Sequence, residues 1–219
     1  MLSHFDTVNF KDFLAKNSAI NADYKTLYSS RSIQKGNIIV GHGDDDKDMY
    51  VLIEGKAKVV LYSEGGHEVH LAQFSPGTVF GEMAMLLGQS RSSNVIAQTD
   101  CCVETLSVGA FTRLLKDHPE FGLYMTHLLA KRLQETSQSL YENLAFSVPQ
   151  RVYGVLLRRA VPTAPDSEVY KISPAPSVTQ LSESLNISRE ATSRAITKLK
   201  SQGLLAKHKG HWNILKPQF

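Results

Sequence analysis

The sequence has few of the residues that mark disulfide-rich, metal-binding or membrane proteins. Its 219 residues include two cysteines and one tryptophan. No apolar run approaches the roughly 20 residues that span a bilayer. Cys101 and Cys102 are neighbours, and neighbours on a strand point to opposite faces, so we expect neither a disulfide between them nor a shared metal ion. We expect ordinary packing for both, with a redox role as the alternative.

Several functional signals are also missing. Residues 1–6 contain no basic stretch leading into an apolar one, so we expect a cytoplasmic protein that makes no contact with a membrane. The sequence has no metal-ligand spacing, no nucleophile–base pairing and no Walker loop, so we expect no enzymatic activity. Asp44, Asp45 and Asp46 lack the alternating ligands and distal glutamate of a calcium loop, and we interpret them as a solvated turn.

The two ends of the chain carry charge of opposite sign. Residues 1–147 hold 13 basic and 17 acidic side chains, a net charge of −4, whereas residues 148–219 hold 11 and 4, a net charge of +7. An acidic body joined to a basic tail is typical of a regulator whose smaller domain binds a polyanion. Basic tails also occur without such a partner, so the charge favours nucleic acid without deciding the matter.

A β-rich segment occupies most of the first half. Residues 1–30 have weak helical periodicity and predict a short helical lead-in. Short apolar runs then alternate with turn residues from Ile33 to Leu106, and the clearest runs cover residues 38–40, 49–53, 59–62 and 69–74. Even spacing with glycine and proline in the turns predicts an antiparallel barrel or jelly roll.

A long helix is predicted after this segment. Residues 109–116 predict a short helix, and Pro119 suits the first position of the next one. Apolar residues then recur every three to four positions, as in Leu123, Ala130, Leu133, Leu140 and Leu144. A repeat of about 3.5 residues is typical of a two-stranded coiled coil, so we interpret the helix as a dimer seam. The alternative is a helix packed only on its own barrel. Pro149 places the domain boundary near residue 147.

The basic C-terminal part predicts a helix-turn-helix. Ser177 is a good N-cap for a helix over residues 177–185, and Ser188 for a second helix over residues 189–201. Two helices joined by a three-residue turn form this motif, with Ile187 facing inward. Two further apolar runs, residues 203–205 and 212–215, predict a small β wing, and residues 169–172 predict a short strand among prolines.

The most specific motif lies in the β-rich segment. Gly81 lets the backbone approach a ligand closely, Glu82 only accepts hydrogen bonds, and Arg91 can bind a phosphate through its planar fork. An acceptor suits sugar hydroxyls, so the three residues predict a cradle for a ribose phosphate. The alternative is a mutual ion pair of Arg91 and Glu82 in a degenerate pocket. Upstream of a DNA-reading element, the cradle indicates a transcription factor switched by a small nucleotide.

Five groups of residues carry a family resemblance. They are Lys35-Gly36 with Gly43-Asp44, Gly81-Glu82 with Arg91-Ser92, Arg132-Leu133-Gln134 with Thr136-Ser137, Asn143-Leu144-Ala145-Phe146, and Ser188-Arg189-Glu190 with Arg194. With these motifs in this order, the chain resembles the cyclic AMP receptor protein/FNR (CRP/FNR) family of bacterial transcription regulators. It resembles the receptor-protein branch of the family more closely than the FNR branch. The resemblance implies an α+β fold: a cyclic-nucleotide-binding β jelly-roll barrel (residues 1–118), a dimerisation helix (residues 119–147) and a winged helix-turn-helix DNA-binding domain (residues 148–219).

The resemblance also implies a nucleotide site. Its members would be Leu71 against the base, Gly81, Glu82 and Met83 near the ribose, Arg91 and Ser92 at the phosphate, and Thr136 and Ser137 on the helix. Glu82 would accept from the 2′-hydroxyl, while Arg91 would pair with the cyclic phosphate and Ser92 would donate to it. One hydroxyl of Thr136 or Ser137 from each subunit would meet the adenine.

DNA recognition is implied for Arg189, Glu190 and Arg194, which share one face of the second helix. Arginine fits the O6/N7 edge of guanine, and glutamate can accept from the amino group of cytosine. In the receptor-protein branch that the chain resembles, the same three residue types at the same spacing read a TGTGA-like half-site, so the resemblance implies a similar palindrome here. Phosphate contacts are expected from the polar and basic residues around this face, namely Ser177, Thr179, Ser188, Lys198, His208 and Lys209.

Cyclic AMP is the effector that the resemblance implies. Cyclic GMP stays open, because Ser92 or Ser93 could meet the 2-amino group of guanine. We expect no metal, haem or iron–sulfur cofactor, because the N-terminal region has no cysteine cluster and His42, His67 and His70 match haem ligands by residue type only.

The implied partners are a second copy of the chain through the 119–147 helix, double-stranded DNA and RNA polymerase. Two rival functions stay open. One is a regulator that needs no ligand, and the other is a nucleotide-sensing module that acts on a protein partner. The intact set of Arg189, Glu190 and Arg194 argues against the second rival.

Overall fold

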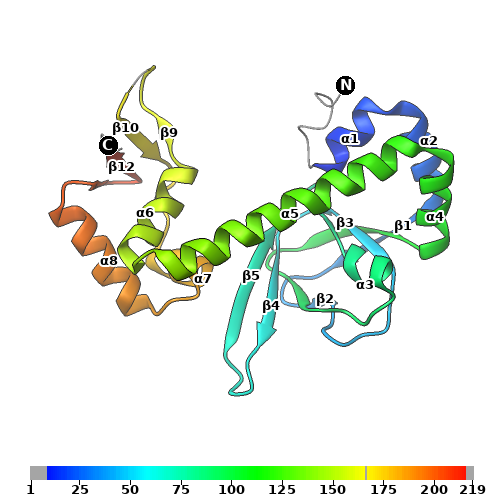
Figure 1. The fold of residues 1–219 in the computed structure, drawn as a ribbon, viewed down its shortest axis with the longest axis horizontal. Coiled ribbons are helices and arrows are strands. Elements are labelled where there is room, and N and C mark those ends of the chain that lie inside the picture. The colour runs from blue at the N-terminus through cyan, green and yellow to red at the C-terminus, as the bar shows by residue number, and fades with distance from the viewer. Residues whose placement is uncertain (1–8, 166, 216–219) are drawn as a thin grey trace. The chain divides into compact units, whose positions relative to one another are not determined.

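The structure, a computed structural model, describes residues 9–165 and 167–215. It divides into two compact units between Gln134 and Glu135, inside the long helix α5 (Pro119–Ala145) (Figure 1). The division falls there because the first half of α5 packs into the core of the first unit, whereas Glu142 in its second half pairs with Arg158 of the second unit.

The first unit contains two short helices followed by a β domain, which confirms the predicted helical lead-in for residues 10–27, while residues 1–8 of that prediction lie outside the described residues. The elements in chain order are α1 (Phe10–Lys16), α2 (Ser18–Leu27), β1 (Tyr28–Ile33), β2 (Ile38–Val40), β3 (Met49–Glu54), β4 (Ala57–Tyr62), β5 (Glu68–Phe74), β6 (Val79–Phe80), α3 (Glu82–Leu87), β7 (Asn94–Ala97), β8 (Cys101–Leu106) and α4 (Val108–Asp117).

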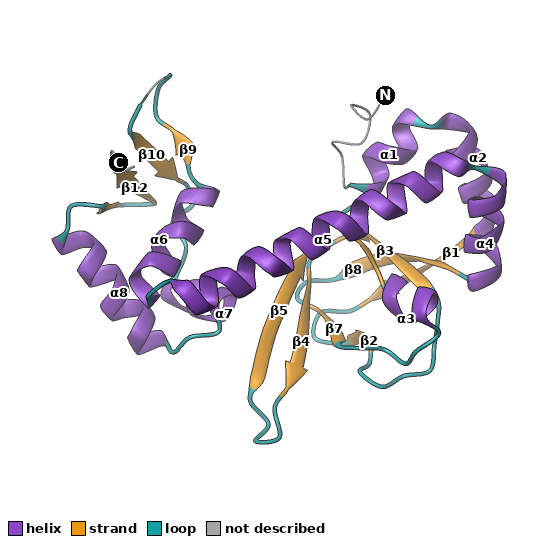
Figure 2. Cartoon of the chain, in the orientation of Figure 1, coloured by secondary structure: helices purple, strands orange, loops and turns teal. Residues whose placement is uncertain are grey.

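The strands form two antiparallel sheets, in the orders β1-β8-β3-β6 and β2-β7-β4-β5 (Figure 2). One core joins both sheets, and it includes Leu52 on β3, Val59 on β4 and Val103 on β8. This arrangement confirms the predicted antiparallel barrel or jelly-roll architecture.

Strand β3 is buried on both faces, which explains its unbroken apolar sequence. Its alternate residues Met49 and Val51 leave the inter-sheet core and join a second core made with the helices. Phe10 of α1 and Phe121 of α5 lie in that core, with their ring centroids 6.3 Å apart. The helices therefore cover the outer face of one sheet and fix the start of α5 on the barrel.

The two cysteines are neighbours on one strand. Both are free, and they lie on opposite faces of β8: Cys101 is buried in the inter-sheet core, and Cys102 is half-buried. The Cys101 thiol lies 3.3 Å from the backbone carbonyl oxygen of Lys56.

The second unit contains the predicted helix-turn-helix and wing. Its elements after α5 are α6 (Val148–Arg159), β9 (Val161–Pro162), β10 (Val169–Ile172), α7 (Val178–Leu185), α8 (Arg189–Ser201), β11 (Leu205–His208) and β12 (His211–Leu215). The strands pair in the order β11-β12-β10-β9. The hydroxyl oxygens of Ser177 and Ser188 accept from the backbone amides of Gln180 and Ala191, so both predicted caps are confirmed. Ile187 in the turn packs against the core, as predicted.

The C-terminal end of α5 is joined to α6 by an ion pair. The guanidinium of Arg158 donates to both carboxylate oxygens of Glu142, at 2.8 and 3.1 Å. Burial opposes ionisation of Glu142, but hydrogen bonds from Gln138 and Arg158 outweigh it and hold the pKa of the carboxyl below its usual range.

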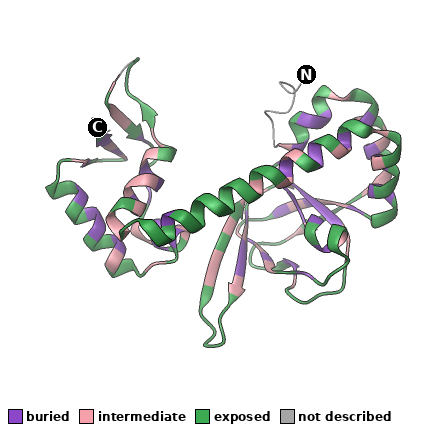
Figure 3. Cartoon of the chain, viewed as in Figure 1, coloured by how far each residue is buried: buried purple, intermediate pink, exposed green. Residues whose placement is uncertain are grey.

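Much of helix α5 is coloured as exposed in Figure 3, and apolar residues are among its exposed positions. They are Leu123, Leu133, Leu140, Tyr141 and Leu144. The dimer seam predicted from the spacing needs such exposed residues, because exposed apolar patches mark interaction surfaces. The seam itself stays a prediction.

The core of the second unit yields a testable prediction. Leu156 on α6 is fully buried, and truncation to alanine is expected to lower the free energy of unfolding of this unit by about 2–5 kcal/mol. The volume-conserving control Leu156→Met should cost less than about 1.5 kcal/mol. Trp212, the single tryptophan, is buried in the same core, so its fluorescence during urea unfolding reports on this unit. Equal midpoints for the two variants would contradict the packing described.

Candidate effector and DNA-binding sites

Two charged residues are buried in the described part of the first unit, Glu82 and Arg91. Both residues belong to the predicted cradle. Glu82 is the first residue of α3, and Arg91 lies in the loop between α3 and β7. Because a buried charge needs a partner, the contacts of these two side chains define what the site can bind.

Gly81 allows the guanidinium of Arg91 to approach the backbone at the start of α3. It is the N-cap of α3 and has a left-handed backbone, with φ of 79°. A Cβ at this position would lie 2.6 Å from Nη1 of Arg91 and 2.9 Å from the carbonyl oxygen of Asp48. Glycine is therefore required both by the backbone conformation and by the close approach of the guanidinium.

Arg91 is surrounded by acceptors. Its Nη1 donates to the carbonyl oxygen of Gly81 at 2.8 Å, and its Nη2 donates to the carbonyl oxygen of Asp48 at 2.6 Å and to Oδ2 of Asp46 at 2.5 Å. Its buried Nε has no hydrogen-bond partner among the described residues. An unpaired buried donor on a cation fits an anionic ligand such as a phosphate.

Asp46 corrects the interpretation of residues 44–46 as a solvated turn. Its side chain forms an ion pair with Arg91 and accepts from the hydroxyl of Tyr50. Burial raises the pKa of Asp46, but the hydrogen bonds from Tyr50, the amide of Asp48 and Arg91 outweigh it, and the net shift is downward. Burial and the same contact raise the pKa of Tyr50 to about 12. The turn pattern alone did not reveal this pair, because Asp46 and Arg91 meet only in the folded barrel.

Glu82 has a different partner. Nη1 of Arg132 on α5 donates to Oε1 of Glu82 at 2.5 Å, and Nη2 of Arg132 donates to the carbonyl oxygen of Val79. Among the described residues, Glu82 and Arg91 form no ion pair with each other, so the mutual pair considered from the sequence is wrong. Arg132 was part of a family motif, but the sequence analysis gave it no role in the site.

The remaining predicted ligand residues are exposed. Leu71 lies on β5 at an irregularity of its pairing with β4, and Met83 lies on α3. Ser92 follows Arg91 and is also exposed. Thr136 and Ser137 are exposed on the part of α5 that belongs to the second unit. Their roles stay predictions.

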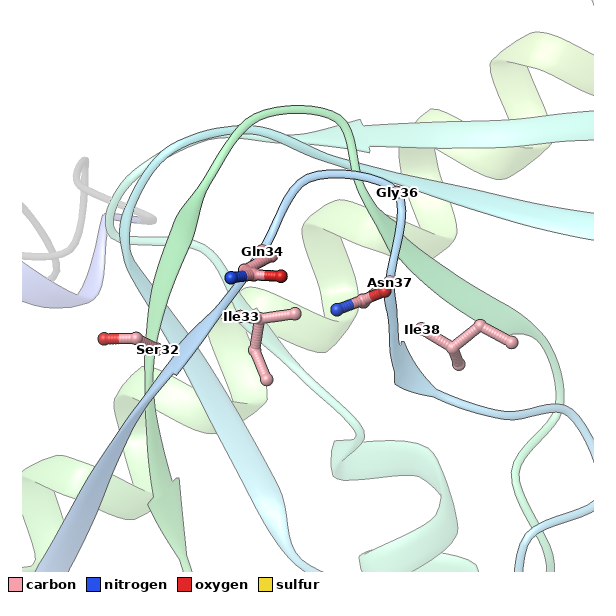
Figure 4. A pocket seen from close by; sticks show the side chains of 6 residues that line it. All are labelled: Ser32, Ile33, Gln34, Gly36, Asn37 and Ile38. Atoms are coloured by element: carbon pink, nitrogen blue, oxygen red, sulfur yellow. The ribbon is translucent and has the colours of Figure 1, made fainter.

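A shallow hollow lies elsewhere on the barrel, at the turn between β1 and β2 (Figure 4). It is lined by Ser32, Ile33, Gln34, Gly36, Asn37 and Ile38. None of these side chains is charged, and none belongs to the predicted nucleotide site. The described residues also contain no group of three or more histidine, cysteine, aspartate or glutamate side chains placed to hold a metal ion.

The second unit presents the predicted reading residues to solvent. Arg189, Glu190 and Arg194 are exposed on α8, whose opposite face packs Ala195 and Leu199 into the core. Within the described chain these three form no ion pair, so their hydrogen-bonding groups can meet base edges.

The predicted phosphate-contacting residues surround α8 in two groups. Ser177, Thr179, Ser188 and Lys198 lie on α7 and α8 or their caps, and His208 and Lys209 lie at the β11–β12 turn. Lys198, His208 and Lys209 are exposed, whereas the hydroxyl oxygens of Ser177 and Ser188 already accept from helix amides. The His208 ring stacks on His211, with centroids 4.9 Å apart.

Comparison with known families matches both units. Residues 30–118 match the cyclic nucleotide-binding domain, and residues 150–218 match the Crp-like helix-turn-helix domain. The cAMP-activated global transcriptional regulator CRP of Pasteurella multocida is 31% identical over 176 residues, which cover 78% of this chain and 82% of that protein. The chain belongs to the CRP/FNR family. It is therefore a DNA-binding transcription regulator with an effector-binding domain, and this family is not enzymatic.

Solved structures of other regulators share the CRP-like fold. The c-di-GMP responsive regulator CLP of Xanthomonas campestris aligns with a TM-score of 0.71 at 20% identity, covering 92% of this chain and 100% of that one. A mutant of CooA from Carboxydothermus hydrogenoformans aligns with a TM-score of 0.77 at 16% identity, covering 97% and 93%. The relative from Pasteurella multocida is cAMP-activated, whereas a protein that shares the fold is c-di-GMP responsive, so the fold by itself does not fix the effector. No helix within the described ranges is long and apolar enough to span a membrane.

Gly81 provides a test of the site geometry. Gly81→Ala should lower the thermal stability of the protein more than Gly88→Ala does. Both glycines have a left-handed backbone, which costs an L-residue about 1–2 kcal/mol. Only at Gly81 does the new methyl group also strike Arg91 and Asp48, since nothing lies within 4 Å of a Cβ at Gly88. Melting followed by circular dichroism measures the difference, and equal losses would contradict the close approach.

Proposed function

We propose that this chain is a cytoplasmic, homodimeric transcription regulator activated by a cyclic nucleotide, cyclic AMP in the first place, and that it binds a TGTGA-like palindrome. The observation that carries the proposal is the pair of buried charges in the barrel. The guanidinium of Arg91 donates to the carbonyl oxygen of Gly81, and its Nε has no partner among the described residues. The buried carboxylate of Glu82 follows Gly81 in the chain, and the two groups match a ligand with one phosphate and neighbouring hydroxyls.

In this proposal each barrel residue has one task. Arg91 pairs with the cyclic phosphate, and Ser92 donates a further hydrogen bond. Glu82, held in place by Arg132, accepts from the ribose 2′-hydroxyl. Gly81 and Met83 flank the ribose, and Leu71 covers the base.

The coupling between ligand and DNA is assigned to α5. Thr136 and Ser137 follow Arg132 by about one helical turn, and one hydroxyl of this pair from each subunit contacts the adenine. The exposed apolar residues of α5 form the seam with the second copy, over residues 119–147. Binding would change the seam so that the two recognition helices enter successive major grooves, about 34 Å apart.

In the complex with DNA, Arg189 and Arg194 read guanine, and Glu190 accepts from cytosine. The six polar and basic residues around α8 contact phosphates. RNA polymerase is the further partner that such a regulator implies.

Two alternatives are favoured by particular observations. Cyclic GMP could use the exposed hydroxyl of Ser92 for its 2-amino group. A regulator without an effector is favoured by the fact that Arg91 and Glu82 each have a partner within the chain.

Fluorescence anisotropy on a labelled TGTGA-type palindrome, at fixed salt, tests the proposal. Cyclic AMP is expected to tighten binding by about 5–150-fold, the usual range of coupling between two sites. Tight binding without nucleotide would support the effector-free regulator. If cyclic GMP acts and cyclic AMP does not, the assignment of the base is wrong.

Two variants separate base reading from phosphate binding. Arg194→Ala should weaken operator binding by about 1–3 kcal/mol and relax the preference at one base pair. Lys209→Ala should weaken binding to all sequences alike and reduce the slope of affinity against salt by about one. Anisotropy with the operator and with single-base variants distinguishes the two patterns. The assignment fails if Arg194→Ala weakens all sequences equally.

A further inference from the structure

The buried guanidinium of Arg91 takes its counter-charge from its own chain. Its side chain is 2% exposed, and its ion pair with Asp46 measures 2.5 Å. The other acceptors, the carbonyl oxygens of Gly81 and Asp48, carry no net charge. In the described ranges Asp46 is the one carboxylate that pairs with Arg91, and an uncompensated buried cation is strongly disfavoured. A phosphate that binds the Nε and Nη2 edge of Arg91 uses the free Nε and displaces an acceptor of Nη2. Of the two acceptors of Nη2, Asp46 is the charged and partly exposed one, so we expect it to be displaced.

The two partners differ in their freedom to separate. Arg91 is enclosed, whereas the side chain of Asp46 is 41% exposed on the loop between β2 and β3. Its carboxylate can return to water at small cost. The loops themselves are joined by backbone hydrogen bonds of 2.9 Å, from the amide of Gly43 to the carbonyl of Arg91 and from the amide of Arg91 to the carbonyl of Asp44. These bonds do not depend on the carboxylate of Asp46, so the pair can open without moving Arg91.

The groups around the Arg91–Asp46 pair favour replacement of the Asp46 carboxylate by another anion. The ring of Tyr50 has the guanidinium groups of Arg31 and Arg91 each 5.2 Å from its centroid, and its hydroxyl donates to Asp46. Burial and the negative charge of Asp46 raise the pKa of Asp48, so two carboxyl groups compete for the same positive surroundings. Removing one of them relieves that repulsion.

We propose that Asp46 is an internal competitor for the anion site at Arg91 and thereby sets the affinity for the effector's phosphate. The inference rests on the proposed function, in which the phosphate of a cyclic nucleotide pairs with Arg91. A cyclic phosphate diester carries one negative charge, as the carboxylate of Asp46 does. The exchange therefore keeps the net charge next to Arg91 constant. The nucleotide affinity then reflects the difference between the free energies with which the phosphate and the Asp46 carboxylate pair with Arg91.

Isothermal titration calorimetry of the full-length protein with cyclic AMP, at fixed salt and pH, tests the inference. Asp46→Asn is expected to bind cyclic AMP about tenfold more tightly, because the competing charge is gone. Asp45→Asn is the matched control. It makes the same charge change on the same loop, but the side chain of Asp45 is 93% exposed. Its Oδ1 accepts from the hydroxyl of Ser90 at 2.8 Å and lies 3.9 Å from the ammonium of Lys47. The affinity of this control variant should stay within about twofold of the wild type.

A second variant tests the inference if Asp46→Asn does not fold. Tyr50→Phe keeps the carboxylate but removes a hydroxyl that holds it, so it should bind about threefold more tightly. Circular dichroism establishes whether each variant is folded. Asp46 is not a competitor if folded Asp46→Asn binds no more tightly than the wild type. The same conclusion holds if only Tyr50→Phe folds and its affinity is unchanged. In both cases the proposed function stands. If neither the wild type nor Asp46→Asn binds cyclic AMP or cyclic GMP, the proposed effector fails as well.

Discussion

A guanidinium cannot be buried in a β-domain without an anion beside it, and this constraint organises the effector-binding unit. Arg91 needs Gly81 for space, two backbone carbonyls for its outer nitrogens and Asp46 for charge. Glu82 raises the same problem with the opposite sign and is compensated by Arg132 on α5. The site that would hold a nucleotide is therefore the place where buried charges of the barrel have partners that a ligand could replace.

Helix α5 is tied at two places by pairs of the same kind. Arg132 binds Glu82 within the first unit, and Glu142 binds Arg158 within the second. Between these pairs lie Thr136 and exposed apolar residues, which within the described chain have no core to pack on. The segment of α5 between these two pairs is where the proposed coupling through a second copy of the chain would act.

Local patterns in the sequence predicted much of this fold. Ser177 and Ser188 fixed both helices of the DNA-reading motif, because capping is decided by residues close in sequence. Glu82 and Arg91 of the predicted cradle are both buried, and their role in binding stays a prediction. Their partners could not be predicted, since Asp46 lies 45 residues from Arg91 and Arg132 lies 50 residues from Glu82. Such pairs depend on strand order and loop docking, and neither leaves a periodic signal in the sequence.

The central claim is that the partner of Arg91 changes from a carboxylate to a phosphate. A crystal structure of the full-length protein with cyclic AMP measures this directly. We predict phosphate oxygens within hydrogen-bond distance of the Arg91 guanidinium, the ribose 2′-hydroxyl on Glu82, and the carboxylate of Asp46 turned to solvent. A complex in which Asp46 still pairs with Arg91 while the nucleotide lies elsewhere would contradict the claim.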